Sequence, residues 1–218
     1  MIKVDFSVYA TRYHIDKAIQ RLFQLPVMSF DVETSGVYSK KERAEALRLL
    51  KNEDLPLDQR RLSLQVSTNS GLSFPSLVSV THFVFGEAED RSTIFVCDNP
   101  GLEYHIWTQL KRYQGLMLIH NTLFDLKIMY HRVKALPQNY EDTALIVKTL
   151  TNHVDTWKSK VGLKELMGVY YDPKWALMDE YEPAFLKEPA FLSYASIDGA
   201  ATFKLWNDVQ NHLNSGED

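Results

Sequence analysis

The segment Val27-Met28-Ser29-Phe30-Asp31-Val32-Glu33-Thr34 decides the fold, because an apolar run here ends in two acids. The run predicts a strand, the first one expected along the chain, and side chains two apart in a strand share a face. Asp31 and Glu33 therefore point the same way, about 6 to 7 Å apart along the backbone. Like charges at this distance repel, and a cation held between them is the simplest compensation. Two acids at this spacing, taken alone, are also typical of a solvated strand end. The interpretation of Asp31 and Glu33 therefore depends on the rest of the chain.

A further acid follows the next strand-to-helix turn that the sequence predicts. Leu116–Ile119 reads as a short buried strand, and residues 120–129 read as a turn that enters a helix. We expect Asn121 to cap this helix and Asp125 to lie one turn inside it, near the carboxyl end of the strand, where open α/β sheets place their ligands. A plain N-cap and an acid favoured by the helix dipole would explain the same two residues.

The third cluster lies on a long helix expected from Phe191 to Leu213. Tyr194 and Asp198 are four residues apart, so they lie on one side of this helix, at the edge of its packing face. A tyrosine at the core edge, satisfied by a local acid, would explain this pair alone. Three such patterns, each on its own element, are much harder to attribute to chance than any one of them.

Together the three clusters resemble the three exonuclease motifs of the DEDDy 3′-5′ exonucleases, most closely the proofreading domain of family-A DNA polymerases. Residues 141–143 and 162–168 also resemble parts of that family, and Ser193 stands where the DEDDh branch needs a histidine. The resemblance covers about residues 25 to 213. It implies an α/β fold of the RNase H-like class, with a mixed sheet flanked by helices. Residues 1–218 would form a single exonuclease domain, with a stand-alone, phage-type version as one form of it.

The resemblance also implies the chemistry of the site. Asp31, Glu33 and Asp198 would hold one divalent cation, Asp31 would bridge to a second, and Asp125 would act through water. Tyr194 would orient the attacking water. Carboxylates without a Cys or His ligand set favour hard cations, so the two cofactors are expected to be Mg2+ or Mn2+. Thr34, Asn121 and Phe124 match family positions that contact the terminal nucleotide, and Val37 matches an apolar wedge between the last two bases.

The function implied is hydrolysis of DNA from its 3′ end to 5′-monophosphates, in replication proofreading or end processing. The expected substrate is a single-stranded or frayed 3′ end, and a DNA polymerase or another replication protein stays open as a partner. An RNase D-like 3′-5′ exoribonuclease shares the motifs and stays open as an alternative. A non-catalytic exonuclease-like domain that binds DNA or a polymerase is a second alternative. Four mutually repelling carboxylates argue against the latter, because they serve no purpose in a binding domain.

Composition agrees with this interpretation. The 218 residues are 45% hydrophobic, which suits one α/β domain, and Cys97 is the only cysteine, which excludes an intrachain disulfide. No apolar run approaches the roughly 18 residues of a membrane span, so we expect a soluble, cytoplasmic protein without a membrane partner. The net charge of -4 is unusual for a nucleic-acid enzyme, but four acids gathered at one site would account for it. Candidate phosphate contacts are Lys127, Lys158, Lys160 and Lys164.

One stretch, at about residues 38–76, departs from the family pattern. Residues 38–51 read as a charged amphipathic helix, 52–61 as a polar run, and 62–76 as a segment punctuated by glycine and proline. Strands are expected to resume at 77–85 and 93–96, paired as a hairpin. We therefore interpret 38–76 as an insertion beside the mouth of the site, which either packs for stability or guides a substrate or partner.

Overall fold

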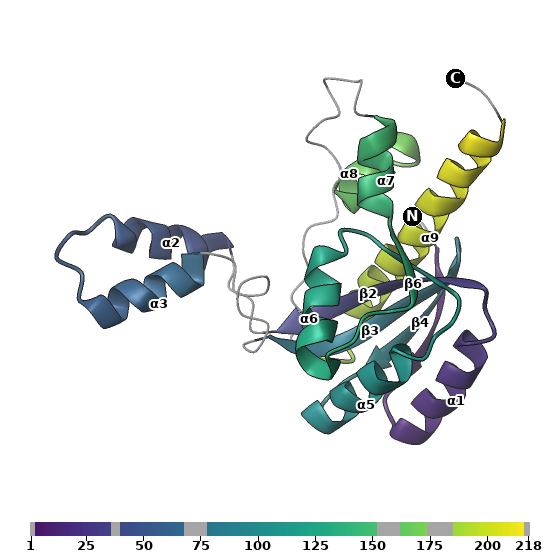
Figure 1. Ribbon diagram of the computed structural model, residues 1–218, viewed down its shortest axis with the longest axis horizontal. Helices are drawn as coiled ribbons and strands as arrows, with labels where there is room; N and C mark the ends of the chain where they lie inside the picture. Colours follow the sequence, from purple (N-terminus) through teal and green to yellow (C-terminus); the bar gives the residue numbers. More distant parts are fainter. Residues whose placement is uncertain (1–2, 36–39, 68–77, 152–161, 174–184, 216–218) are drawn as a thin grey trace.

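The computed structural model describes residues 3–35, 40–67, 78–151, 162–173 and 185–215. Its centre is a mixed sheet of six strands in the order β1-β4-β3-β2-β5-β6, with helices on both faces (Figure 1). This confirms the expected mixed α/β sheet. The strands are β1 (Asp5–Tyr9), β2 (Val27–Ser35), β3 (Ser79–Ala88), β4 (Arg91–Val96), β5 (Leu116–Ile119) and β6 (Asn139–Asp142).

Strand β2 is central, pairing antiparallel with β3 and parallel with β5. β3 and β4 form the expected antiparallel hairpin, and β6 extends the sheet parallel to β5. The prediction that the first strand begins at Val27 is wrong, because β1 and the helix α1 (Arg12–Leu22) precede it. β1 pairs in parallel with β4 from Asp5 opposite Arg91 to Tyr9 opposite Phe95. This pairing joins segments more than 80 residues apart, so no local pattern indicates it.

Two different sets of helices cover the two faces of the sheet. On one face, Phe30, Phe83 and Phe85 pack against Trp107 of α5 (Pro100–Leu110), in a core that α1 and α6 (Leu123–Val133) complete. On the other face, Val84 lies in a cluster with residues of α9 (Pro189–Ser215). Because successive side chains in a strand alternate between faces, Asp31 and Glu33 lie on the α9 side, opposite Phe30 and its neighbours.

Helix α9 crosses the sheet at very short range. This close approach sets how far Asp198, the acid on α9, lies from β2. The Ser29 hydroxyl donates a hydrogen bond of 2.6 Å to the Gly199 carbonyl. A Cβ atom on Gly86 would lie 2.4 Å from the same carbonyl oxygen, so glycine is required at this contact. The far half of α9 packs with α7 (Thr143–Leu150) and α8 (Leu163–Tyr170), through buried residues such as Leu166 and Leu205.

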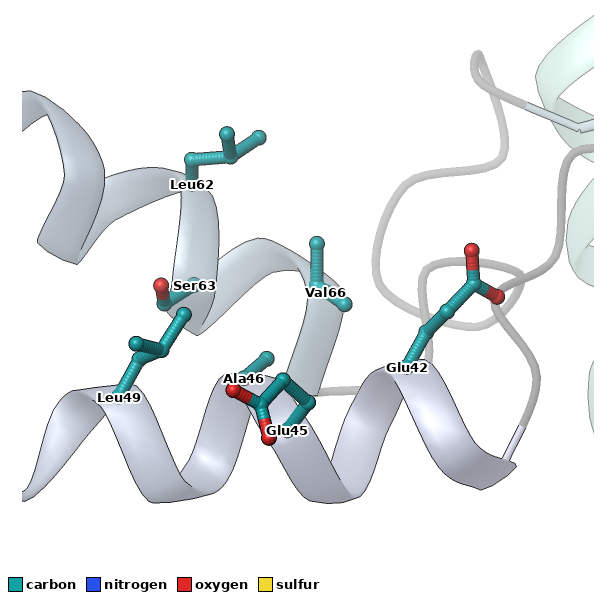
Figure 2. A pocket seen from close by; sticks show the side chains of 7 residues that line it. All are labelled: Glu42, Glu45, Ala46, Leu49, Leu62, Ser63 and Val66. Atoms are coloured by element: carbon teal, nitrogen blue, oxygen red, sulfur yellow. The ribbon is translucent and has the colours of Figure 1, made fainter.

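In the described part of the stretch between β2 and β3 lie two helices, α2 (Lys40–Leu50) and α3 (Leu57–Ser67), of which only the first was expected. Helix α3 was not expected: it begins at Leu57, inside the polar run 52–61, and continues into the segment that follows. Figure 1 shows this hairpin standing apart from the sheet. A cavity of about 500 Å³ lies along it, lined by Glu42, Glu45, Ala46, Leu49, Leu62, Ser63 and Val66. Figure 2 shows these side chains on the two helices.

That residues 1–218 form one domain with an insertion at 38–76 stays a prediction. Residues 36–39 and 68–77, the ends of this insertion, lie outside the described residues. Among the helices that the structure describes, none is both long enough and apolar enough to cross a membrane.

Candidate active site

Three carboxylates come together where β2 passes beneath α9. One oxygen from each of Asp31, Glu33 and Asp198 lies within 4.8 Å of the other two. The strand periodicity places Asp31 and Glu33 on one face, and the Ser29–Gly199 hydrogen bond holds the neighbouring residue Asp198 against that face. Ligand atoms at this separation could contact a common cation.

The fourth acid reaches the same place from α6. Asp125 is buried in the first turn of this helix, and its Oδ1 atom accepts a hydrogen bond of 3.1 Å from the backbone N–H of Val32. Val32 stands between Asp31 and Glu33 in β2, so this bond ties Asp125 to the strand at the acid pair. The structure therefore brings together all four acids that the sequence nominated.

The turn before α6 is held differently from the way the sequence suggested. The prediction that Asn121 caps α6 is wrong, because Asn121 has a positive φ of 64° and Thr122 occupies the N-cap position, with its hydroxyl bonded to Asp142 and not to the helix. Asp142 supplies the acceptors instead: it bonds the backbone N–H groups of Asn121 and Thr122 at 3.1 and 3.0 Å. The same carboxylate caps α7 through Ala144 and Leu145. One acid from β6 thus fixes the turn that leads to Asp125.

Burial and mutual repulsion make the four acids reluctant to ionise together. Burial holds the pKa of Asp31 well above its usual range, and the charges of Asp125, Glu33 and Asp198 raise it further. Burial raises the pKa of Glu33 to about 7, that of Asp125 to about 8, and that of Asp198 to about 6. The charges of nearby acids add to this rise at Glu33 and Asp125. Lys164 opposes this effect at Glu33 and Asp198.

The donor set fits a hard divalent cation. All candidate ligands are carboxylate oxygens, which Mg2+ and Mn2+ prefer, and their crowding means that a cation would relieve repulsion as well as bind. Asp31, Glu33 and Asp198 are the residues placed to hold it, with Asp125 behind them.

Tyr194 lies one helical turn before Asp198 on α9. Its hydroxyl accepts a hydrogen bond from the ammonium of Lys164, which also lies 4.3 Å from the centre of the tyrosine ring. Sequence reasoning named Lys164 only among four candidate phosphate contacts and missed this pairing. The available signal was its place in residues 162–168, the segment that resembles the helix before the third motif.

His82 is a second residue that the sequence reasoning missed. It is fully buried on β3 opposite Glu33, and its ring lies 4.8 Å from that of Phe191 on α9. Its two ring nitrogens lie 3.0 Å from the Thr81 hydroxyl and 2.6 Å from the Leu186 carbonyl. Burial lowers the pKa of His82, which favours the neutral ring, and its contacts brace the strand beside Glu33. A histidine within an apolar strand was the only signal.

The residues predicted to contact the substrate are less firmly held by the structure than the four acids. Thr34 is half-buried in β2, at a register shift just after Glu33, and Asn121 is exposed at the turn before α6. Phe124 is half-buried and packs against the hydrophobic core. Val37 and Lys160 lie outside the described residues.

No family model matches the sequence, and no curated protein is similar to it in sequence. Solved structures are similar to it in fold. Brucella melitensis NrnC with bound Mg2+ is 15% identical with a TM-score of 0.56, over 98% of this chain and 83% of NrnC. The catalytic core of RRP6 from Trypanosoma brucei is 11% identical with a TM-score of 0.62, over 98% of this chain and 48% of that one.

Escherichia coli RNase D, an exoribonuclease involved in structured RNA processing, is 11% identical with a TM-score of 0.55, over 97% of this chain and 46% of RNase D. The chain thus spans about half of the RRP6 and RNase D chains. These likenesses confirm the RNase H-like fold of the DEDD exonucleases. The closer resemblance to the proofreading domain of family-A polymerases stays a prediction.

Proposed function

We propose that this protein is a metal-dependent 3′-5′ exonuclease. The observation that carries the proposal is the meeting of Asp31, Glu33 and Asp198 within 4.8 Å, in the fold that NrnC and RNase D share. Crowded, half-buried carboxylates with raised pKa values destabilise a protein unless a ligand uses them, so their gathering indicates chemistry and not folding. The Mg2+ bound to the similar NrnC supports the choice of a divalent cation.

Each residue would then have one task. A bound pair of divalent cations would supply an activated water and would stabilise the charge that develops on the phosphate. Asp31, Glu33 and Asp198 would hold the cations, and Asp125 would keep the β2 backbone in place while contributing charge behind them. The Tyr194 hydroxyl would orient the attacking water toward the phosphorus. The product would be a nucleoside 5′-monophosphate, released from the 3′ end.

The proposed substrate is the 3′ end of DNA, single-stranded or frayed, in proofreading or end processing. A site that works on the last nucleotide must receive it unpaired, so a mismatched end requires less melting. Short RNA is the second candidate, because the similar NrnC is described bound to pGG and RNase D is an exoribonuclease. A polymerase or another replication protein would raise the local concentration of 3′ ends for an enzyme of net charge -4.

A substrate panel tests the proposal. The protein is incubated with 5′-labelled single-stranded DNA, blunt duplex, a mismatched primer-template, RNA of the same sequence, and pGG, each with Mg2+, Mn2+ or EDTA. We expect metal-dependent shortening from the 3′ end, faster on single-stranded and mismatched DNA than on blunt duplex. Faster cleavage of RNA or pGG would favour the second candidate. Equal rates on blunt duplex and single strand would contradict the proofreading role.

A further inference from the structure

Lys164 enters the site from α8, a helix that carries none of the four acids. This helix is anchored by Leu166 and Met167, both fully buried in the cluster that α8 shares with α9. The Lys164 side chain is half-buried between this anchor and the active-site end of α9. An anchored helix and a half-buried stem restrict where the ammonium can go, unlike a surface lysine that is free to sample many rotamers.

The ammonium of Lys164 contacts Tyr194 and acts electrostatically on two acids of the site. It donates a hydrogen bond to the Tyr194 hydroxyl and lies 4.3 Å from the ring centre of the same tyrosine. Its charge also acts on the carboxylates of Glu33 and Asp198, two of the three clustered acids. The lysine therefore links the tyrosine to the acids without being an acid or a cation ligand itself.

This contact constrains what the tyrosine can do. A phenol has one proton to donate, and its oxygen can accept hydrogen bonds. When the ammonium, which can only donate, bonds to that oxygen, the phenolic proton points away from the ammonium, and under the proposed function it would be donated to the attacking water or to a phosphate oxygen. The position of the ammonium beside the ring also limits rotation of the side chain. Lys164 thereby fixes both the position and the donor direction of the Tyr194 hydroxyl.

We propose that Lys164 is a positioning residue of this nuclease, acting through the hydroxyl of Tyr194. The inference rests on the proposed function and adds to it a residue outside the set of four acids and one tyrosine. Its effect is expected on turnover more than on substrate binding, because the oriented hydroxyl matters most when the water attacks.

The chain offers a matched control in Lys204. Its ammonium lies 4.3 Å from the ring centre of Tyr171, the same distance as in the Lys164–Tyr194 pair. Its carboxylate partners are Glu89 and Asp208, at 3.2 and 3.3 Å, and neither belongs to the acid cluster. Replacing Lys204 removes a comparable lysine–tyrosine contact at a distance from the chemistry.

A double-mutant cycle tests the inference. kcat and KM are measured on a short single-stranded oligonucleotide with saturating Mg2+ for Lys164→Met, Tyr194→Phe and the double variant. We expect Lys164→Met to lower kcat about 10- to 100-fold, as expected for a residue that orients a catalytic group, and to change KM much less. In the Tyr194→Phe background the same change should lower kcat by no more than about twofold, because the hydroxyl is already gone. Lys164→Arg should recover part of the activity, and Lys204→Met should match the wild type.

Two outcomes would overturn the inference. Equal losses of kcat in both backgrounds would show that Lys164 acts independently of the Tyr194 hydroxyl, and a rise in KM alone would make it a phosphate contact. The tyrosine ring resonances of the metal-free protein, followed by NMR, provide a readout that needs no activity. Lys164→Met should shift those of Tyr194, while unshifted resonances would overturn the contact. A wild type inactive on every substrate would overturn the proposed nuclease function, and the NMR result would still decide whether Lys164 positions Tyr194.

Discussion

The acid cluster, formed by Asp31, Glu33, Asp125 and Asp198, differs from the α2–α3 hairpin in the kind of side chain that is buried. Asp125, an ionisable residue, is 2% exposed beside β2, whereas Leu57, an apolar one, is 65% exposed on α3. The cluster is held by contacts from β2, α6 and α9, and from the turn that joins β5 to α6. The hairpin packs mainly on itself, with Ala46 and Ser63 buried where its two helices meet. The cluster therefore depends on the whole fold, and the hairpin can change without disturbing it.

The largest expected effect is at the centre of the cluster. Asp31→Asn or Asp198→Asn should lower activity by at least about 1,000-fold, the upper range for losing one preorganised electrostatic group. The same variants should unfold at equal or higher temperature without metal, because a buried repulsion has been removed. Both quantities come from initial rates and thermal unfolding of the same preparations.

Glu45→Gln is the matched control in the hairpin, since Glu45 is exposed and pairs with Arg48 at 2.7 Å. It should leave activity unchanged. Activity near wild type in Asp31→Asn would refute the assignment of the cluster as the metal site.

Tyr194→Phe should have the next largest effect. Removing one oriented hydroxyl should lower kcat about 10- to 1,000-fold, the range for one positioned group in a transition state. Affinity for Mg2+, measured by calorimetry, should be retained. Tyr104→Phe, an exposed tyrosine on α5, serves as the control. Loss of metal binding in Tyr194→Phe would instead make the tyrosine a structural residue.

The pH dependence of stability should also separate the two regions. Glu33, Asp125 and Asp198 have folded pKa values of about 7, 8 and 6, above those of the unfolded chain. The folded state therefore binds more protons, so the free energy of unfolding without metal should fall as pH rises from about 5 to 9. Mg2+ should offset this fall by favouring the charged acids. Hairpin acids such as Glu45, whose pKa is lowered by Arg48, add no slope in this window.

Urea unfolding at several pH values, with and without Mg2+, measures this dependence. Asp125→Asn should flatten the slope of the metal-free protein. A stability that rises with pH between 5 and 9 in the absence of metal would contradict the assignment of raised pKa values to these acids.

The smallest expected effect is that of removing the hairpin. Replacing residues 40–67 by a short flexible linker should leave the rate on short single strands within about twofold, because loop length changes stability only slowly. It should weaken processive action on longer strands or association with a replication partner. Gel assays on both lengths of substrate measure the first effect. Loss of folding would show that the hairpin belongs to the core, and unchanged behaviour on every substrate would show that it guides nothing.

The sequence predicted those elements whose pattern is local. β2, β5, the β3–β4 hairpin and α9 all show strand or helix periodicity within their own residues, and the structure has them. β1 was missed because its residues are mostly exposed and its pairing with β4 is long-range. α3 was missed because its apolar residues, such as Leu57 and Leu62, do not fall on one face of a helix.

The sequence identified the residues of the candidate site but did not reveal how they are arranged in space. Motif spacing named the four acids and Tyr194, but their approach depends on Gly86 and Gly199, which allow α9 to lie against β2. The capping role assigned to Asn121 was wrong because Asp142, a distant acceptor, satisfies that turn. The Lys164–Tyr194 contact joins residues 30 apart on two helices, so no spacing rule reveals it.

The proposed nuclease uses the acid cluster and a divalent cation to hydrolyse phosphodiesters at a 3′ end. The decisive experiment identifies the first product released from a single-stranded oligonucleotide labelled in its 3′-terminal nucleotide, with Mg2+ and with EDTA. We predict that the label appears as a nucleoside 5′-monophosphate in Mg2+ and is not released in EDTA. Release of a 3′-monophosphate, of longer labelled fragments from internal cuts, or of equal product in EDTA would contradict the account.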